Sequence, residues 1–549
     1  MIKRLIAVAM TLLILAGLFG CGQKGTETDS ESETVTDAPK TELLVEELAS
    51  YKVIYVDGLS LNCLKRVRAL QSTLEDKYGV EIASSSDNAE VGEYEILIGR
   101  TNRKESDEGA KRSPKVDDYS IVAIGKKIVV TAYTESKLIE AINDLIAHIE
   151  GLDEEGCFYG TGYEKLSLGE YDNEDMLIDG VSVSEYTIVY KEGSEGLALA
   201  QMVADAICEK SGYVLRMSTS PVDGRMILVG DTDKGAPSEM TGSQSKTRYY
   251  VGVCDGDLYL YGKELTGAYR AVEELIKEIT AADGKLIELT PDSGEVTFED
   301  ASITSMTFNV YYDTSDSQRM NNVIMTIRKY SPDTFGVQEA TGTWISKLSS
   351  AFGSEYAYVG KGRLNNGSSS DEYSAIFYKK SRFELLESGT KWLSDTPDTA
   401  GSQMSGAHYP RVFTYALLKD KLTGENFLCV NTHTDHVDDG GAVRLKQVKV
   451  ITDFIKANSP DTPLILTGDL NDIETASSIR HLLNSGLDDS ADLALLSDKV
   501  PTFKQKTIDY LLLSKDDFTV YSYTVDTSTY SGEYPSDHRA VLIKYELKK

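Results

Sequence analysis

The chain has 549 residues, enough for about three or four domains of roughly 150 residues each. Its formal net charge is −31 at pH 7, and such an acidic surface repels polyanions and lacks the basic footprint of nonspecific nucleic-acid binding. Apart from Cys21, five widely spaced cysteines remain, and this odd, scattered set excludes a disulfide framework or a metal site built on cysteines.

The N-terminus has the pattern of an export signal. Lys3 and Arg4 precede an apolar run of roughly 15 residues, which is too short for a comfortable membrane span. The run ends in Leu-Phe-Gly-Cys at Cys21, which resembles the lipobox of bacterial lipoproteins. The resemblance implies a signal peptide at 1–20, a lipid on Cys21, and a chain anchored to the membrane at the bacterial cell surface. The alternative is an ordinary secretory signal with an incidental cysteine.

A tether follows the signal. Residues 21–45 are rich in Thr, Ser, Glu and Gly, with almost no apolar side chain before Leu43. Such a composition cannot bury enough apolar surface to offset the entropy of ordering, so we expect a flexible segment.

The front half contains an internal repeat, predicted as two small α+β domains at 46–165 and 180–295. YKVIYVDG at Tyr51 is echoed by YTIVYKEG at Tyr186, and a longer stretch aligns Tyr119 with Tyr249 without gaps. In each copy the periodicity predicts a strand, a helix, a strand ending in Gly, a hairpin and a closing helix. The pattern resembles the noncatalytic α/β domain before the barrel of some hexosaminidases and α-glucuronidases, which hints at a carbohydrate-rich setting. A simple spacer is the alternative.

Six polar clusters follow in the C-terminal half, most of them after an apolar, β-rich run. They are Asn309; Gln338 with Glu339; His433; Asp469 with Asn471; Asp509; and Asp537 with His538. Carboxylates and an amide can hold a hard divalent cation, and imidazoles can move protons and meet phosphate charge. This inventory suits metal-assisted attack on a phosphate ester and indicates an enzyme.

The blocks TFNV, GVQEA, EYSAIFY, VNTHTDH, TGDLND, TIDYLLL and PSDHRAV stand in this order from Ser302 to the C-terminus. All seven together resemble the endonuclease/exonuclease/phosphatase superfamily, which has a deoxyribonuclease-I-like fold. The resemblance implies an α/β fold in which a four-layer α/β/β/α catalytic domain, at 300–549, follows the two α+β domains. It also implies Mg²⁺ or Mn²⁺ as cofactor.

The resemblance assigns the metal site and the proton transfers. Glu339 would be the principal metal ligand, Asn309 would contribute nearby, and Asp537 would add a direct or indirect contact. His538 would be the general base, with Asp509 fixing its tautomer. The alternatives are a carboxylate that caps the next helix for Glu339 and a turn residue at the strand start for Asp509.

The other catalytic positions face the phosphate. By resemblance His433 would donate to a phosphoryl oxygen, with Glu372 as its orienting partner. Asp469 and Asn471 are two residues apart and face the same side of an extended segment, so Asp469 could orient the water and Asn471 could bind the phosphate. A plain turn at the strand end is the competing interpretation.

Three further residues are candidates for substrate binding: Arg411, His436 and Arg444. His436 could equally be solvated or structural, and Arg444 could be an exposed charge on a helix.

The sequence differs from that of abasic-site endonucleases, one branch of the superfamily, and this difference limits the expected substrates. Val310 and Tyr311 follow Asn309 where abasic-site endonucleases carry an acidic residue, and no Lys/Arg-rich stretch could grip duplex DNA. We therefore expect a phosphorylated small molecule, a lipid phosphate or a sugar phosphate, with nucleic acid possible but not favoured. An extracellular nuclease and a non-catalytic lipoprotein that binds a glycan or a partner are the alternatives.

Overall fold

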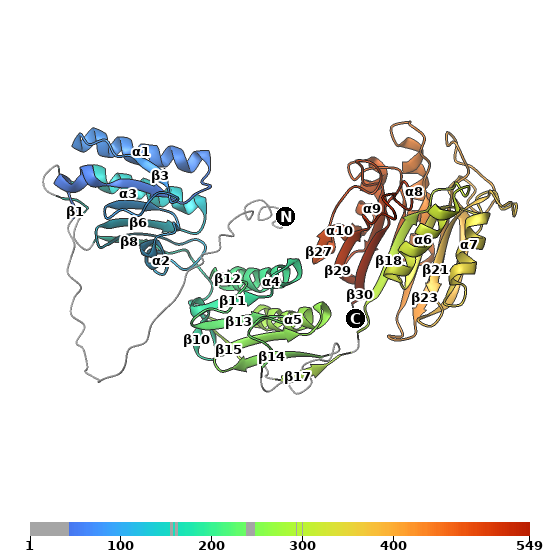
Figure 1. Cartoon of the computed structure of the whole chain (residues 1–549), viewed down its shortest axis with the longest axis horizontal. Coiled ribbons are helices and arrows are strands. Elements are labelled where there is room, and N and C mark those ends of the chain that lie inside the picture. The colour runs from blue at the N-terminus through green and yellow to red at the C-terminus, as the bar shows by residue number, and fades with distance from the viewer. Residues whose placement is uncertain are drawn as a thin grey trace. The chain divides into compact units, whose positions relative to one another are not determined.

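The structure is a computed structural model that describes residues 43–153, 157–159, 163–237, 248–291, 294–298 and 300–548. The predicted lipidation site Cys21 and most of the predicted tether lie outside these residues. Within them, no helix is both long and apolar enough to cross a membrane. The chain divides into two compact units, Met1–Arg112 with Tyr119–Leu166 and Ser113–Asp118 with Ser167–Lys549 (Figure 1).

The first unit is built on one six-stranded sheet. Its strand order is β3 (Ser84–Ser86), β2 (Lys52–Tyr55), β4 (Glu95–Ile98), β6 (Lys127–Ala132), β5 (Tyr119–Ile124) and β8 (Glu164–Ser167). The helices α1 (Leu61–Tyr78) and α3 (Glu135–Gly151) bury their apolar faces against this sheet in one core. The short α2 (Lys104–Ala110) contacts β5 and β6. Two further strands, β1 (Leu43–Leu44) and β7 (Cys157–Tyr159), pair with each other.

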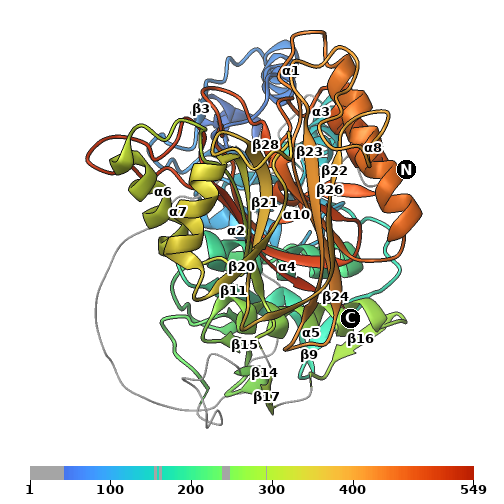
Figure 2. The same ribbon diagram turned by 90° about the vertical axis from the view of Figure 1, so that its right-hand side faces the viewer.

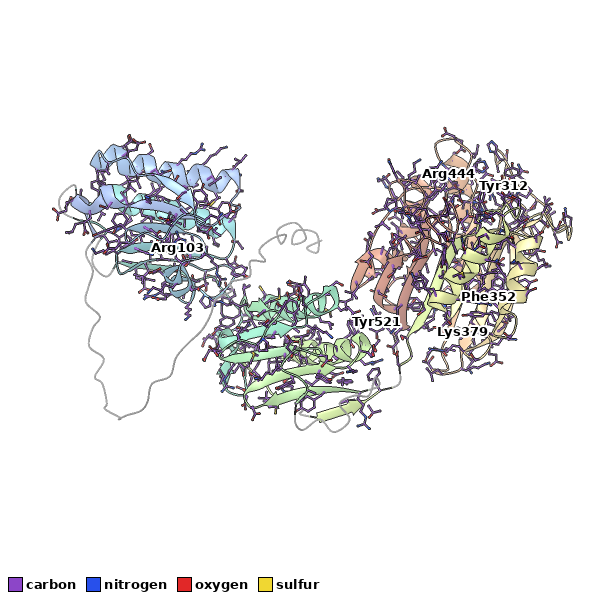
Figure 3. All side chains as sticks on the ribbon, viewed as in Figure 1. Arg103, Tyr312, Phe352, Lys379, Arg444 and Tyr521 are labelled. Carbon is purple, nitrogen blue, oxygen red and sulfur yellow. The ribbon has the colours of Figure 1, made fainter. Side chains whose placement is uncertain are left out.

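One buried ionic group stands out in this unit. The Arg103 guanidinium donates to the carbonyls of Asp87 (2.9 Å) and Ala89 (2.8 Å), and it lies 3.4 Å from the Glu95 carboxylate (Figure 3). Lys127 pairs with the other oxygen of Glu95 at 2.9 Å. Each buried charge therefore has a partner, as burial requires.

The second unit contains a sheet with the same strand order. It runs β12 (Arg216–Ser218), β11 (Tyr186–Tyr190), β13 (Arg225–Val229), β15 (Asp257–Gly262), β14 (Arg248–Cys254) and β17 (Gly294–Thr297). The helices α4 (Ser194–Ser211) and α5 (Leu265–Ala281) share its core. The unit also contains a small sheet of β9 (Asp175–Ile178), β10 (Val181–Ser182) and β16 (Leu286–Leu289). In the chain, β9 and β10 precede β11, and β16 follows α5. The duplication and its boundaries stay predictions, and the matching strand order agrees with them.

The C-terminal part of this unit holds two further sheets, of seven and six strands. The seven-stranded sheet runs β20 (Tyr356–Val359), β21 (Glu372–Lys379), β19 (Thr334–Thr341), β18 (Ile303–Asn309), β30 (Val541–Leu547), β29 (Phe518–Val525) and β27 (Leu496–Asp498). The six-stranded sheet runs β22 (Phe383–Trp392), β23 (Val412–Asp420), β24 (Asn426–His433), β25 (Leu464–Asp469), β28 (Asp509–Ser514) and β26 (Leu487–Asp489).

Three hydrophobic cores bind these sheets to each other and to helices. One core combines inward-facing residues of both sheets, among them Ile303 and Phe383. A second joins the seven-stranded sheet to α6 (Ser317–Tyr330) and α7 (Gly342–Phe352). A third joins the six-stranded sheet to α8 (Ala442–Asn458) and α9 (Ser477–Asn484). Figure 2 shows α6 and α7 on one side of the strands and α8 on the other. The predicted α/β class is confirmed.

A polar cluster crosses the interface between the two sheets. The Gln338 amide donates to Thr307 Oγ1 (3.0 Å) and to Asn431 Oδ1 (2.7 Å). The Asn431 amide in turn donates to the carbonyls of Val337 and Ala375, both at 2.9 Å. Because these bonds join strands of different sheets in a buried layer, they fix the register of one sheet against the other.

Candidate active site

The strand pairing brings three predicted residues into one row. His433, at the end of β24, lies opposite Asp469 of β25, and Asp469 lies opposite Asp509 at the start of β28. Asn309 ends β18, a central strand of the other sheet. Polar side chains that are separated by up to about 200 residues in sequence thus meet at one edge of the two sheets.

Asp469 is the centre of this group. Its Oδ2 atom accepts a hydrogen bond from Asn309 Nδ2 at 3.0 Å. The same oxygen lies 3.5 Å from His433 Nε2 and 3.7 Å from His538 Nε2. Burial and the neighbouring Asp509 raise the pKa of Asp469, while His538 opposes the rise. The two predicted imidazoles, the predicted amide and the carboxylate therefore share one site.

Glu339 joins the site through Asn309 and through a distorted strand. Its Oε1 accepts from the same Asn309 Nδ2 atom at 3.1 Å, and its Oε2 accepts from the Tyr312 backbone N–H at 3.1 Å. The pairing of β19 with β21 is irregular between Val337 and Ala340, and Glu339 has a φ of 55°. A left-handed glutamate in a β-bulge is strained, and such strain is typical of functional positions.

His538 and Asp509 form a buried pair. Nδ1 of His538 donates to the Asp509 carboxylate, with distances of 2.9 and 3.1 Å to its two oxygens. This bond leaves Nε2 facing Asp469. Although burial disfavours the charged imidazole, Asp509, with Asp469 and Asp537, raises the pKa of His538 to about 10. Asp509 thus fixes one tautomer and raises the basicity of the ring.

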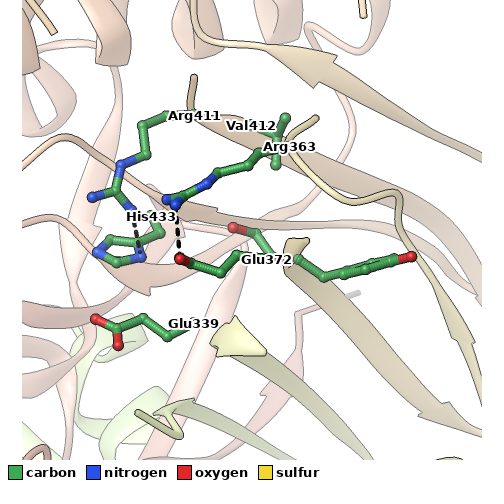
Figure 4. Close-up of a pocket in the computed structure, with 8 residues that line it drawn as sticks. Glu339, Arg363, Glu372, Arg411, Val412 and His433 are labelled. Atoms are coloured by element: carbon green, nitrogen blue, oxygen red, sulfur yellow. Dashed lines mark hydrogen bonds and ion pairs between the residues drawn. The ribbon is translucent and has the colours of Figure 1, made fainter. Parts of the chain in front are cut away.

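His433 has an arginine as its partner, which corrects the prediction for Glu372. Arg411 lies 2.8 Å from Nδ1 of His433, whereas Glu372 pairs with Arg363 at 2.7 Å (Figure 4). A guanidinium can only donate, so Nδ1 must accept and the proton must stand on Nε2. Burial, with the charge of Arg411, holds the pKa of His433 well below its usual value. His433 is therefore a neutral ring whose Nε2–H points into the site.

The same arginine contacts His436, a predicted substrate-binding residue. Arg411 lies 3.2 Å from Nδ1 of His436, and His436 Nε2 lies 3.4 Å from His408 Nδ1. His408, His436 and Asp435 come close enough to share a metal ion. However, the donation from Arg411 puts the proton of His436 on Nε2, the atom that would have to bind the ion. Hydrogen bonds explain this cluster better than a cation does.

Asn471 completes the row beside His433. Its backbone N–H donates to Asp469 Oδ1 at 2.9 Å, which is the turn foreseen at this strand end. Its Nδ2 lies 3.0 Å from His433 Nε2 and 3.1 Å from the carbonyl of Thr434. Because Nε2 of His433 carries the proton, the Asn471 side-chain amide must turn its oxygen to that N–H, and the two polar side chains lie side by side next to Asp469.

The donor set fits a hard divalent cation. Glu339 and Asp469 point their carboxylates at one amide, and Asp509 adds a third negative charge nearby. The raised pKa of Asp469 reflects this excess of carboxylates in a buried place. Oxygen donors of this kind suit Mg²⁺ or Mn²⁺, which bind one or two carboxylates and keep several waters.

Two predicted residues lie apart from this centre. Asp537 is exposed and accepts from Ser536 Oγ at 3.3 Å, and among the described contacts no hydrogen bond or ion pair joins it to Glu339 or Asn309. Arg444, predicted to bind substrate, is buried, pairs with Asp472 at 2.8 Å and donates to the carbonyl of Val437 at 2.6 Å. Its guanidinium binds groups of the protein around the loop before α8 instead of facing a substrate, so the prediction that Arg444 binds substrate is wrong.

Sequence reasoning missed two arginines that shape the site. Arg363 stands in a Gly/Asn/Ser-rich segment and carries no motif, yet it pairs with Glu372. Arg319 donates to the carbonyls of Val310 (2.8 Å) and Tyr311 (3.3 Å), and so holds the loop that brings the Tyr312 N–H to Glu339. Only the long-range fold reveals these partners.

Comparison with known proteins finds relatives of the C-terminal part. Residues 306–538 match the model of the Endonuclease/Exonuclease/phosphatase family. Protein angel of Drosophila melanogaster is 28% identical over 180 residues, which are 32% of this chain and 49% of that protein. The chain thus spans about half the length of this curated relative.

Two solved structures are similar to a part of the chain. An endonuclease/exonuclease/phosphatase from Bacteroides vulgatus is 28% identical, covers 45% of this chain and 99% of its own, and has a TM-score of 0.42. The mannosyl-6-phosphatase of Bacteroides thetaiotaomicron VPI-5482 is 30% identical, covers 45% of this chain and 100% of its own, and has a TM-score of 0.42.

Proposed function

We propose that this chain is a divalent-metal-dependent phosphoesterase, because residues 306–538 match the model of the Endonuclease/Exonuclease/phosphatase family. It would hydrolyse phosphomono- or phosphodiester bonds by in-line attack of water. The observation that carries the proposal is the convergence of Asn309, His433 and His538 on one carboxylate oxygen of Asp469. The substrate would be a phosphorylated small molecule, such as a lipid phosphate or a sugar phosphate.

Glu339, with Asn309 beside it, would hold Mg²⁺ or Mn²⁺. When bound, the cation supplies Lewis-acid chemistry that neutralises charge on the phosphate. Hydrogen bonds from Asn309 and from the Tyr312 backbone hold this carboxylate in position.

His538 would take the proton from the attacking water through Nε2. Asp509 holds the Nδ1 proton on the opposite side of the ring, so the basic nitrogen faces Asp469 and the site. Asp469 would orient the water, because its oxygen lies next to both imidazoles.

His433 and Asn471 would bind the phosphoryl oxygens. Their side chains lie side by side next to Asp469, where charge would develop as the pentacoordinate transition state forms. His433 does this as a neutral donor, because Arg411 occupies its other nitrogen.

The test uses the full-length chain, purified in detergent, with aryl phosphomonoester and phosphodiester substrates. Activity should require Mg²⁺ or Mn²⁺ and disappear with EDTA. His538→Ala and Asp469→Asn should each lower kcat/KM by about 100-fold or more, whereas the control His481→Ala, on the far helix α9, should not. Activity that survives EDTA, or that is unchanged in His538→Ala, would contradict the proposal.

The alternatives are separated by further substrates. Degradation of plasmid DNA or RNA at nanomolar enzyme would favour an extracellular nuclease. A wild-type chain that is silent on both ester panels, yet retained on a glycan array, would favour a binding protein.

We also propose that the chain is a lipid-anchored protein of the bacterial cell surface. The support is the lipobox-like end of the apolar run at Cys21, followed by the polar segment 21–45. The two predicted α+β domains, at 46–165 and 180–295, would act as a spacer between the anchor and the catalytic domain at 300–549. Radioactive palmitate should label the wild-type chain in cells, and Cys21→Ser should abolish the label.

A further inference from the structure

A small pocket adjoins the proposed reaction centre. Glu339 and His433 line it on the side of the centre, and Arg363, Glu372 and Arg411 line the remainder (Figure 4). Val412, a buried residue, also lines it. The volume open to the centre of a water-sized group is about 10 Å³, which is room for about one oxygen atom.

Arg411 is a buried cation without a hydrogen-bonded carboxylate. Its side chain is 5% exposed, and its described hydrogen bonds go to ring nitrogens of His433 (2.8 Å) and His436 (3.2 Å). The carboxylate of Asp435 lies 3.8 Å from Nε, and Nε has no hydrogen-bond partner among the described residues. A buried charge is costly unless it is paired, so this guanidinium is suited to an anion that is not part of the chain.

Arg363 brings a second guanidinium to the same pocket. It pairs with Glu372 at 2.7 Å and lies over the ring of Tyr409, 4.5 Å from its centroid. These contacts fix its orientation. Burial, followed by the charge of Arg363, lowers the pKa of Arg411, while the carboxylates of Glu372, Asp435 and Asp469 oppose this shift.

We propose that Arg363 and Arg411 form an anion subsite for one non-bridging oxygen of the scissile phosphate, which makes phosphomonoesters the substrates. This rests on the proposed phosphoesterase function. A monoester phosphate has three non-bridging oxygens and carries about −1.5 to −2 charges near pH 7. One oxygen faces the cation site at Glu339, one faces His433 and Asn471, and the third enters the pocket.

A phosphodiester does not fit this arrangement. It has only two non-bridging oxygens, so an ester oxygen with its carbon would have to enter a pocket that has room for about one atom. In the reaction, the water oxygen forms a bond to phosphorus and the single ester P–O bond breaks. The electron pair leaves with the alcohol oxygen, which takes up a proton, and inorganic phosphate remains.

The test compares p-nitrophenyl phosphate with bis(p-nitrophenyl) phosphate, using the full-length chain with Mg²⁺ or Mn²⁺. The wild type should prefer the monoester by at least 100-fold in kcat/KM. Arg363→Gln should lower monoester turnover by 10-fold or more and change diester turnover by less than 3-fold. Arg480→Gln, an exposed arginine on α9, is the matched control and should change neither.

Substitution of the buried Arg411 could impair folding, so a second measurement compares phosphate binding in two variants. The inhibition constant of inorganic phosphate, a dianion that would occupy the subsite, should rise at least 10-fold in Arg363→Gln and in Arg411→Lys. A wild type that prefers the diester, or an Arg363→Gln variant that loses both activities equally, would overturn the subsite and leave the phosphoesterase intact. No turnover of either ester by the wild type would instead overturn the phosphoesterase proposal and the subsite with it.

Discussion

At the scale of single residues, the site separates its two histidines by the partner behind each ring. The negative charge of Asp509 lies beside His538 and raises the pKa of that ring. Burial, together with the positive charge of Arg411 beside it, lowers the pKa of His433. A general base needs the first environment and a neutral hydrogen-bond donor needs the second. Asp509 and Arg411 therefore predict that His538 is the general base and that His433 is the neutral hydrogen-bond donor.

Asp509→Asn tests the role of the carboxylate behind His538. The substitution removes the charge that raises the pKa of His538, so the folded-state pKa must fall. If His538 acts as a base, it works only when deprotonated, and the acid limb of the kcat/KM profile should therefore move to lower pH. The maximum rate should drop about 100- to 10,000-fold, because the amide no longer enforces the tautomer. Rate profiles from pH 5 to 10 measure both effects.

The control for this change is Asp492→Asn, which alters an exposed carboxylate paired with Lys499. Its profile should match the wild type. An acid limb that stays in place in Asp509→Asn would show that His538 is not the titrating base.

At the scale of elements, Gly336 permits the close approach of the two sheets. A Cβ atom at this position would lie 2.6 Å from both Asn431 Oδ1 and Thr467 Oγ1. Both atoms belong to the polar cluster between the sheets and cannot move without losing hydrogen bonds. The strand β19 therefore needs glycine here because of packing rather than backbone freedom.

Gly336→Ala should lower the free energy of unfolding by about 1–3 kcal/mol, because overpacking forces the cluster apart. Urea denaturation measures the change, and Ser350→Ala on the exposed face of α7 is the control. Wild-type stability in Gly336→Ala would mean that the two sheets can separate slightly at no cost.

The sequence allowed the strand ends to be predicted because strand periodicity is local. Asn309, His433 and Asp469 each close an apolar run, and each ends a strand in the structure. The partners were less predictable. Arg411 reaches His433 only through the register of β23 against β24, and Arg444 meets Asp472 across a loop.

The bulge at Glu339 was also hidden, for a different reason. A left-handed backbone conformation is usually predicted from a glycine in the sequence, but position 339 is a glutamate. The distortion comes from the pairing of β19 with β21 and from the Tyr312 N–H that holds the carboxylate, neither of which the local sequence reveals.

At the scale of the whole molecule, the proposed cation site belongs to one domain with its own cores. The core of the first compact unit includes none of the site residues, whereas the sheet of β11–β15 shares the second unit with the catalytic sheets, to which the Arg270–Glu546 ion pair joins it. A ligand stabilises only the structure that it binds, so the cation should act on one folding unit alone.

Scanning calorimetry with Mg²⁺ and then with EDTA tests this independence. At 100 times its Kd, the cation should stabilise the catalytic domain by about 2.7 kcal/mol and raise its Tm by about 5 to 10 °C. The transition of the first compact unit should keep its Tm. Glu339→Gln should remove the shift. A common shift of all transitions, or none in the wild type, would contradict a single cation site in this domain.

The bulged strand at Glu339 also bears on protein engineering. Copying the local sequence around Glu339 into a regular strand would not reproduce the position of its carboxylate. Without the bulge, the side chain would point to the opposite face of the sheet. Anyone who grafts this centre onto another scaffold must therefore rebuild the mismatched pairing first, and only then choose the side chains.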